Sequence, residues 1–166
     1  MQDDLNSLYA FNRWADQRIL EKVRLLSFEQ YTQEPVPGWS SVRATLVHVA
    51  GATLIWARRL EGELITARPT EDEYPSLADV EQLLTKGHAA FGRLLTTLTP
   101  ERLNTIWSYR NLSGQECRTP LWAVYRHVVN HATYHRGQIA SKLGRFGIDP
   151  PFTDLVFWAT EQTPQS

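Results

Sequence analysis

The chain has 166 residues, a net charge of −1 and 42% hydrophobic residues, which is enough for one domain (residues 1–166) with a sizeable core. There is no basic patch or charge run for nucleic acid or an anionic membrane surface, and no apolar run as long as a membrane span. The single cysteine excludes an internal disulfide and a cysteine-cluster metal site, and the acidic, polar N-terminus, unlike a secretory signal, favours a cytoplasmic protein.

The first half of the chain carries two predicted helices. Apolar residues recur at three- and four-residue spacing in residues 5–26, with charged residues between them, which predicts an amphipathic helix. A proline-rich loop follows and breaks the pattern. Ser40 or Ser41 is then expected to cap a second helix that ends near Glu61.

The middle of this second helix contains no charged residue. Residues 46–57 include no Asp, Glu, Lys or Arg. A helix that is apolar on most sides is buried on most sides, whereas one small bundle covers a single broad stripe. We therefore expect a subunit interface here, and with it a homodimer.

A third helix follows a loop at residues 62–75. Ser76 is placed to cap it, and its apolar stripe extends over residues 77–98. Thr99 and Pro100 are expected to end it.

The second half of the chain is expected to begin with a hairpin and continue as one long helix. Aromatic and β-branched residues on both sides of a Gly-containing turn predict a hairpin at residues 106–119. Residues 121–146 read as a long helix, with Thr119 as its cap and Pro120 at its first position. Gly147 lies just past its end, where a left-handed residue commonly stops a helix.

A short helix at residues 154–162, after a break at Asp149 and two prolines, completes the set. These elements predict an all-α fold. It is a four-helix bundle with a short hairpin before the last long helix and a short C-terminal helix.

Three histidines recur every four residues in the long helix. His127, His131 and His135 therefore lie near one face, with neighbours roughly 6 Å apart along the axis. Two neighbours can share one metal ion, but the outer two, roughly 12 Å apart, cannot both share it with the middle one. One histidine of the three is therefore left over.

A fourth histidine, His48, lies in the uncharged middle of the second helix. Alone, His48 is more simply explained as a hydrogen-bonded core residue. The His131–His135 pair alone could be a coincidence on a solvent-facing surface, but its apolar neighbours argue against full exposure. Together the three residues supply what an open metal site needs. Zn²⁺ and similar ions accept three imidazoles and keep a fourth position for water or substrate.

Three stretches of the chain resemble one family. They are FNRWADQRIL near the start, SVRATLVHVAGATLIWARRLEG in the second helix, and NHATYHRGQIASKLGRFGIDPPFTDLVFW at the end. In this order they resemble the DinB-like (YfiT-type) bacterial proteins. The resemblance implies a four-helix bundle, often a homodimer, with a divalent metal held by His48, His131 and His135. It leaves His127 as an outer partner or core residue.

The resemblance also implies a function. Relatives of this fold are associated with transferase or isomerase chemistry that uses thiols such as bacillithiol or mycothiol, so we expect a metal-dependent S-transferase or isomerase with a small-molecule thiol cosubstrate. Triple imidazole suits Zn²⁺, Ni²⁺, Co²⁺ or Fe²⁺, and we expect Zn²⁺ or Ni²⁺. A hydrolase with metal-activated water, and a non-enzymatic metal-binding stress-response dimer, are the alternatives.

Other polar residues have open roles. Arg136 is expected to face an anionic substrate or the solvent. Asn130 and Gln138 are candidates to orient a ligand imidazole, and Cys117 is expected to be a passive thiol. Four tryptophans are expected in the core or, as the alternative, in the wall of a pocket: Trp39, Trp56, Trp122 and Trp158.

Overall fold

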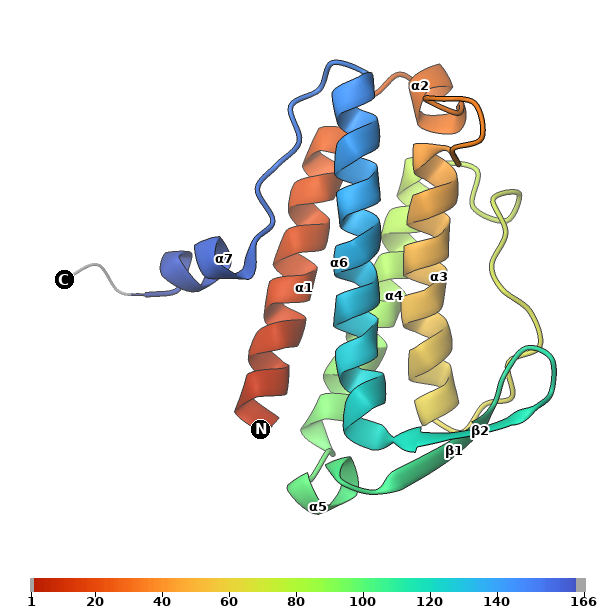
Figure 1. The fold of residues 1–166 in the computed structure, drawn as a ribbon, viewed down its shortest axis with the longest axis vertical. Helices are drawn as coiled ribbons and strands as arrows, with labels where there is room; N and C mark the ends of the chain where they lie inside the picture. Colours follow the sequence, from red (N-terminus) through yellow and green to blue (C-terminus); the bar gives the residue numbers. More distant parts are fainter. Residues whose placement is uncertain (1, 164–166) are drawn as a thin grey trace.

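The computed structural model describes residues 2–163, which form seven helices and one antiparallel hairpin (Figure 1). The elements are α1 (Gln2–Val23), α2 (Phe28–Thr32), α3 (Val42–Leu60), α4 (Leu77–Thr96), α5 (Pro100–Leu103), β1 (Ile106–Arg110), β2 (Glu116–Pro120), α6 (Leu121–Arg145) and α7 (Leu155–Glu161). The long helices α1, α3, α4 and α6 make the bundle. This confirms the predicted all-α four-helix bundle with a hairpin before the last long helix and a short C-terminal helix.

The four long helices run up, down, down and up in chain order (Figure 1). Because α3 and α4 are parallel, the connection at residues 61–76 must return along the whole length of the bundle. This crossover packs against α3 at Gly51, where an added Cβ would lie only 2.9 Å from Pro69 Cγ. The close contact holds the crossover beside α3, where it becomes one wall of the pocket described below.

The bundle core consists of two groups of buried side chains. One contains the rings of Tyr9, Phe91 and Tyr125, and the Tyr9 hydroxyl donates to the backbone carbonyl of Tyr125 at 3.0 Å. The other group contains Ile139 and Leu143 of α6. No helix within residues 2–163 is long and apolar enough to cross a membrane.

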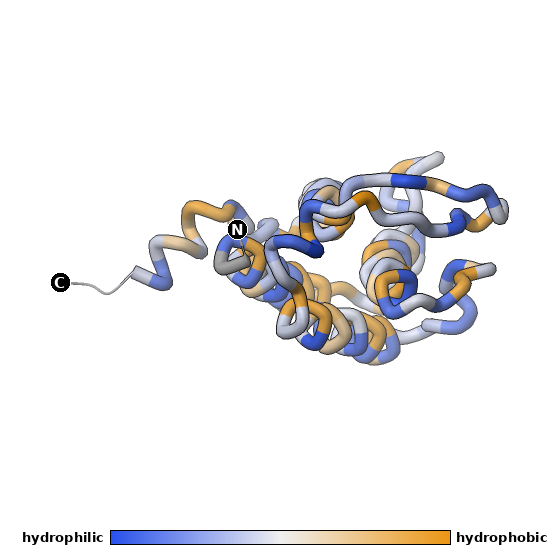
Figure 2. Tube along the Cα trace, turned by 90° about the horizontal axis from the view of Figure 1, so that it is seen from below, coloured by the Kyte–Doolittle hydropathy of each residue, from blue (hydrophilic) through white to orange (hydrophobic). Residues whose placement is uncertain are grey.

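The uncharged middle of α3 is covered largely by its own chain. Of the twelve residues at positions 46–57, eight are buried and four are half-buried. Helices α4 and α6 pack along α3, and the crossover covers Gly51. The large exposed apolar residues of the described chain lie elsewhere, and several of them are near α7, where Phe152 is 71% and Val156 is 64% exposed. Viewed along the bundle, α7 projects from its side and carries apolar residues (Figure 2).

The homodimer stays a prediction, and multi-angle light scattering tests it. We expect the mass of two chains at micromolar concentration, because large exposed apolar groups such as those near α7 are commonly covered by a partner. The mass of one chain, 19.1 kDa, would contradict the prediction.

Several element boundaries differ from the prediction. Helix α2 was read as loop, but Ser27 and Gln30 form a capping box that starts it. Thr99 caps the short helix α5 rather than only ending α4. Thr119 does not cap α6, because it pairs with Trp107 within the hairpin, and the α6 terminus has no side-chain cap. Strand pairing therefore overrides a locally plausible helix cap.

Ser41 and Ser76 do cap α3 and α4, as predicted, by accepting hydrogen bonds from Ala44 and Asp79. Gly147 has a φ of +76°, which confirms the left-handed stop after α6.

Candidate metal centre

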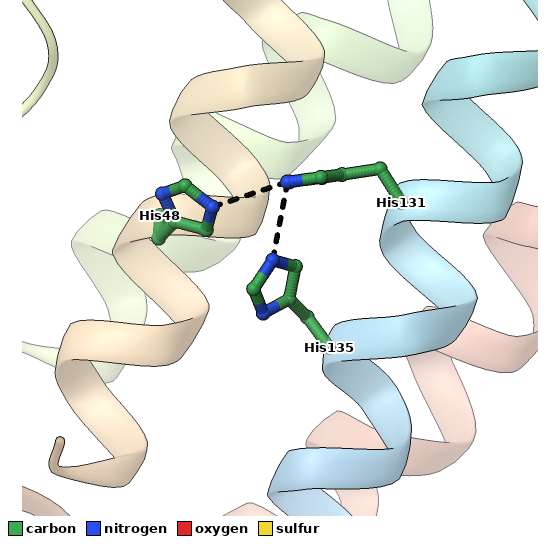
Figure 3. Close-up of side chains that lie close together, drawn as sticks. All are labelled: His48, His131 and His135. Atoms are coloured by element: carbon green, nitrogen blue, oxygen red, sulfur yellow. Dashed lines mark hydrogen bonds between the residues drawn. The ribbon is translucent and has the colours of Figure 1, made fainter. Parts of the chain in front are cut away.

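Three histidine side chains from two helices converge in the bundle (Figure 3). His48 comes from α3, and His131 and His135 come from α6. The Nε2 atom of His131 lies 3.1 Å from Nε2 of His48 and 3.1 Å from Nε2 of His135. The candidate ligand nitrogens all lie within 4.8 Å of one another. The structure thus brings together the three residues that the sequence singled out.

The separation of these nitrogens is close to that of a bound triad. Imidazole nitrogens arranged tetrahedrally at about 2.0–2.1 Å from one ion lie about 3.3 Å from one another. His131 and His135 are one turn apart on α6, and α3 packs against that side of α6. Small side-chain rotations would therefore suffice to complete the coordination.

Hydrogen bonding fixes which nitrogen of His135 carries its proton. Nδ1 of His135 lies 2.7 Å from Oε1 of Gln138 and donates to it, so Nε2 turns a lone pair toward His131. One proton on Nε2 of His131 can serve His48 or His135, but not both. A cation at the centre would satisfy all three nitrogens at once. Gln138 is thereby confirmed as the group that orients a triad imidazole.

Burial and mutual repulsion favour the neutral forms of His131 and His48 at neutral pH. Burial, and then the neighbouring His135 and His48, lower the pKa of His131 from 6.5 to about 4. Burial, followed by His135 and Arg68, also lowers the pKa of His48. Metal ions bind neutral imidazole, so these shifts favour binding at neutral pH.

The same shifts predict how the stability of the metal-free protein depends on pH. Below about pH 6.5 the unfolded chain takes up protons that folded His131 and His48 do not, so the free energy of unfolding should fall as the pH drops toward 4. Urea unfolding with a chelator at pH 7.5, 6 and 5 measures this, and the His131→Ala variant should show a weaker dependence. A wild-type midpoint that does not fall between pH 7.5 and 5 would contradict it.

A pocket of about 680 Å³ opens beside the triad and reaches His48 and His131. Helix α3 contributes Trp56 and Arg59 to its wall, the crossover contributes Arg68, and the hairpin contributes Tyr109. This volume falls within the range of small-molecule sites. The open side of the triad therefore faces a cavity that a substrate could enter.

His127 lies outside the triad and belongs to the pocket wall. Its ring centroid is 5.5 Å from that of His131 and 5.3 Å from that of Trp56. It makes no hydrogen bond to the triad histidines. His127 is exposed and is therefore not a core residue.

The sequence predicts that Arg136 faces either an anionic substrate or the solvent, and both interpretations are wrong. Arg136 is 2% exposed and points toward α1, where its Nη1 donates to Asn12 Oδ1 and Asp16 Oδ1, each at 2.7 Å. Its Nη2 donates to Thr133 at 2.7 Å. His88, which the sequence analysis passed over, places Nε2 3.1 Å from Asp16 Oδ2. Together these groups form a polar network inside the bundle.

The remaining candidates are accounted for as follows. Asn130 is exposed and makes no hydrogen bond to a triad histidine. Cys117 is a half-buried free thiol in the hairpin. Among the tryptophans, Trp56 lines the pocket and Trp158 packs against the core. Trp39 and Trp122 are exposed, contrary to the core prediction, but Trp39 lines a second, smaller pocket, as the alternative had it.

Comparisons with known proteins agree with this architecture. The model of the DinB family matches residues 1–165. The chain is 29% identical to Protein DinB of Bacillus subtilis (strain 168), over 93% of this chain and 92% of that protein. Two solved structures have the same fold. A DinB-like protein from Bacillus cereus ATCC 10987 has a TM-score of 0.58 and 18% identity, covering 84% of this chain and 91% of that one. A DinB-like protein, YjoA, from Bacillus subtilis has a TM-score of 0.65 and 15% identity, covering 89% and 96%.

Proposed function

The chain belongs to the DinB family, and on that premise we propose that it is a metal-dependent enzyme that transfers or isomerises groups with a small thiol. His48, His131 and His135 would hold one divalent ion, Zn²⁺ or Ni²⁺. We place this chemistry in the cytoplasm, where thiols are kept reduced.

One observation carries the proposal. Nε2 of His131 lies 3.1 Å from Nε2 of His48 and of His135, and the three candidate ligand atoms lie within 4.8 Å of one another at the edge of a cavity large enough for a small molecule. Three protein ligands and one open position are the pattern of catalytic metal sites, whereas structural sites are closed. His48 and His131 line the cavity, so the open position would face it.

The chain's own residues would position the reactants. A bound divalent ion lowers the pKa of a thiol at its open position and so supplies a thiolate at neutral pH. Gln138 holds the His135 ring by its Nδ1, so that Nε2 stays available as a ligand. Trp56 and Tyr109, with ring centroids 5.1 Å apart, form an aromatic wall that limits access of water to a bound electrophile.

The test is a thiol screen with zinc- and nickel-loaded protein and a chromogenic aromatic halide as electrophile. We expect thiol-dependent product formation that His131→Ala abolishes. Hydrolysis of a chromogenic ester without thiol would instead identify a hydrolase. Full metal occupancy with neither reaction would contradict an enzymatic role for these substrates and favour a metal-binding protein without turnover.

A further inference from the structure

Arg59 lies in the pocket wall and makes no ion pair within the part of the chain that the structure describes. Its guanidinium lies 5.0 Å from the ring centroid of Trp56 and 5.3 Å from that of Tyr109. Its Nε atom is buried and has no hydrogen-bond partner within residues 2–163. Because Nε is buried, the two Nη groups, which make no hydrogen bond within the described residues, are the groups that can bind an oxyanion in a fork.

The other half-buried arginines of the described residues, Arg18 and Arg43, each pair with a carboxylate. Arg58, the next residue on α3, is largely exposed and pairs with Glu63 at 2.6 Å. Arg43 and Arg93 are likewise paired with carboxylates, at 3.0 and 3.1 Å. A partly buried guanidinium without such a partner is costly unless a ligand supplies one.

The pocket as a whole has an excess of positive charge. Arg68 of the crossover lines the same cavity, and no ion pair holds it within the described residues. Among the described residues that line the cavity, Glu71 is the one carboxylate, and Arg43 already pairs with it at 3.0 Å. A metal ion would add further positive charge beside His48. The pocket therefore favours an anionic ligand.

The spacing along α3 sets the length of that ligand. Arg59 lies eleven residues after His48, but its guanidinium lies over Trp56, which is eight residues after His48. At 1.5 Å per residue the guanidinium is thus roughly 12 Å along the helix axis from the triad. Three extended amino-acid residues span roughly 10 Å. A molecule of tripeptide length, bound at one end through its sulfur and at the other through hydrogen bonds, would span this separation.

We propose that the pocket binds an elongated anionic thiol, with its sulfur at the triad and a carboxylate at Arg59. Arg68 adds positive charge to the same wall. This rests on the proposed metal-dependent function for the sulfur end, but not for the carboxylate end, because Arg59 and its two rings are in place independently of an ion. The proposal narrows the cosubstrate from any small thiol to one with a carboxylate roughly 10 Å from its sulfur.

Calorimetry with zinc-loaded protein tests the proposal, using glutathione as a tripeptide thiol with free carboxylates and its diethyl ester as the uncharged counterpart. We expect glutathione to bind more tightly than the ester. Arg59→Gln should weaken glutathione binding roughly 10- to 100-fold, the effect of losing a hydrogen bond to a charged group, and leave ester binding and zinc content unchanged. The glutathione affinity of Arg59→Lys should lie between those of wild type and Arg59→Gln, because lysine keeps the positive charge but cannot donate two parallel hydrogen bonds to one carboxylate. Arg58→Gln is the matched control and should bind like wild type.

Equal binding of glutathione and its diester by wild type, or equal glutathione binding by wild type and Arg59→Gln, would overturn the proposal. Metal-free protein and S-methylglutathione, which lacks the thiol, separate this inference from the proposed function. If metal-free protein binds S-methylglutathione and Arg59→Gln weakens this binding, the carboxylate site is supported even if no thiol chemistry is found. Tighter binding of inorganic phosphate than of succinate at Arg59 would assign a phosphate ligand and overturn the carboxylate.

Discussion

Replacing His131 by alanine should empty the metal site. His131 is the central residue of the triad, with Nε2 at 3.1 Å from both partner nitrogens, so its loss removes one ligand and the contact that aligns the other two. We expect a loss of affinity well beyond the roughly 10- to 100-fold that follows removal of an outer hydrogen-bond partner. Metal content of the purified variant, and zinc titration against a competing chelator, measure this.

His127→Ala is the matched control, because His127 lies one turn away on the same helix and outside the triad. It should keep the ion with at most a 10- to 100-fold loss. If His127→Ala emptied the site while His135→Ala kept the ion, the metal would lie one turn closer to the start of α6.

Replacing Arg136 by alanine should destabilise the fold by roughly 3–5 kcal/mol. The change leaves Asp16 buried without the guanidinium that lies 2.7 Å from its Oδ1, and it also removes donors to Asn12 and Thr133. Urea unfolding of the metal-free protein measures the loss. Metal binding by the folded fraction should persist, since this network lies between α6 and α1 rather than at the triad.

Arg126→Ala is the control for Arg136. Arg126 is on the same helix, but its ion pair with Asp4 at 3.2 Å is exposed. Such surface pairs contribute about 0–1 kcal/mol. Similar losses for Arg136→Ala and Arg126→Ala would mean that the buried network contributes no more to stability than an exposed pair.

The helices and the triad could be predicted because their signals are local. Apolar periodicity and the caps Ser41 and Ser76 define α3 and α4 within a few residues. The four-residue spacing puts His131 and His135 on one face of α6. The spacing alone does not decide whether His131 shares a metal ion with His127 or with His135. The resemblance to a family selects His131 and His135, together with His48.

The polar network could not be predicted because it depends on packing between distant segments. Arg136 and Asp16 are 120 positions apart, and each is ordinary on a helix surface until the other helix is placed against it. Taken singly, a charged residue is expected to be exposed. His88 carried no signal of its own, since its partner Asp16 is on another helix.

The pocket was missed for a different reason, namely topology. The long connection at residues 61–76 is itself a signal that α3 and α4 are parallel, because antiparallel neighbours need only a short loop. That direction requires the crossover to return along the bundle, but it does not say which side the crossover takes. The contact between Gly51 and Pro69 fixes its path, and sequence alone does not reveal that contact.

The measurement that tests the metal centre most directly is X-ray absorption at the metal edge of loaded wild-type protein and His131→Ala. We expect three imidazole nitrogens at about 2.0–2.2 Å from the ion in wild type, with a further position that changes when a thiol is added. In His131→Ala this signal should be lost. A wild-type spectrum without imidazole scattering, or one that His131→Ala leaves unchanged, would contradict it.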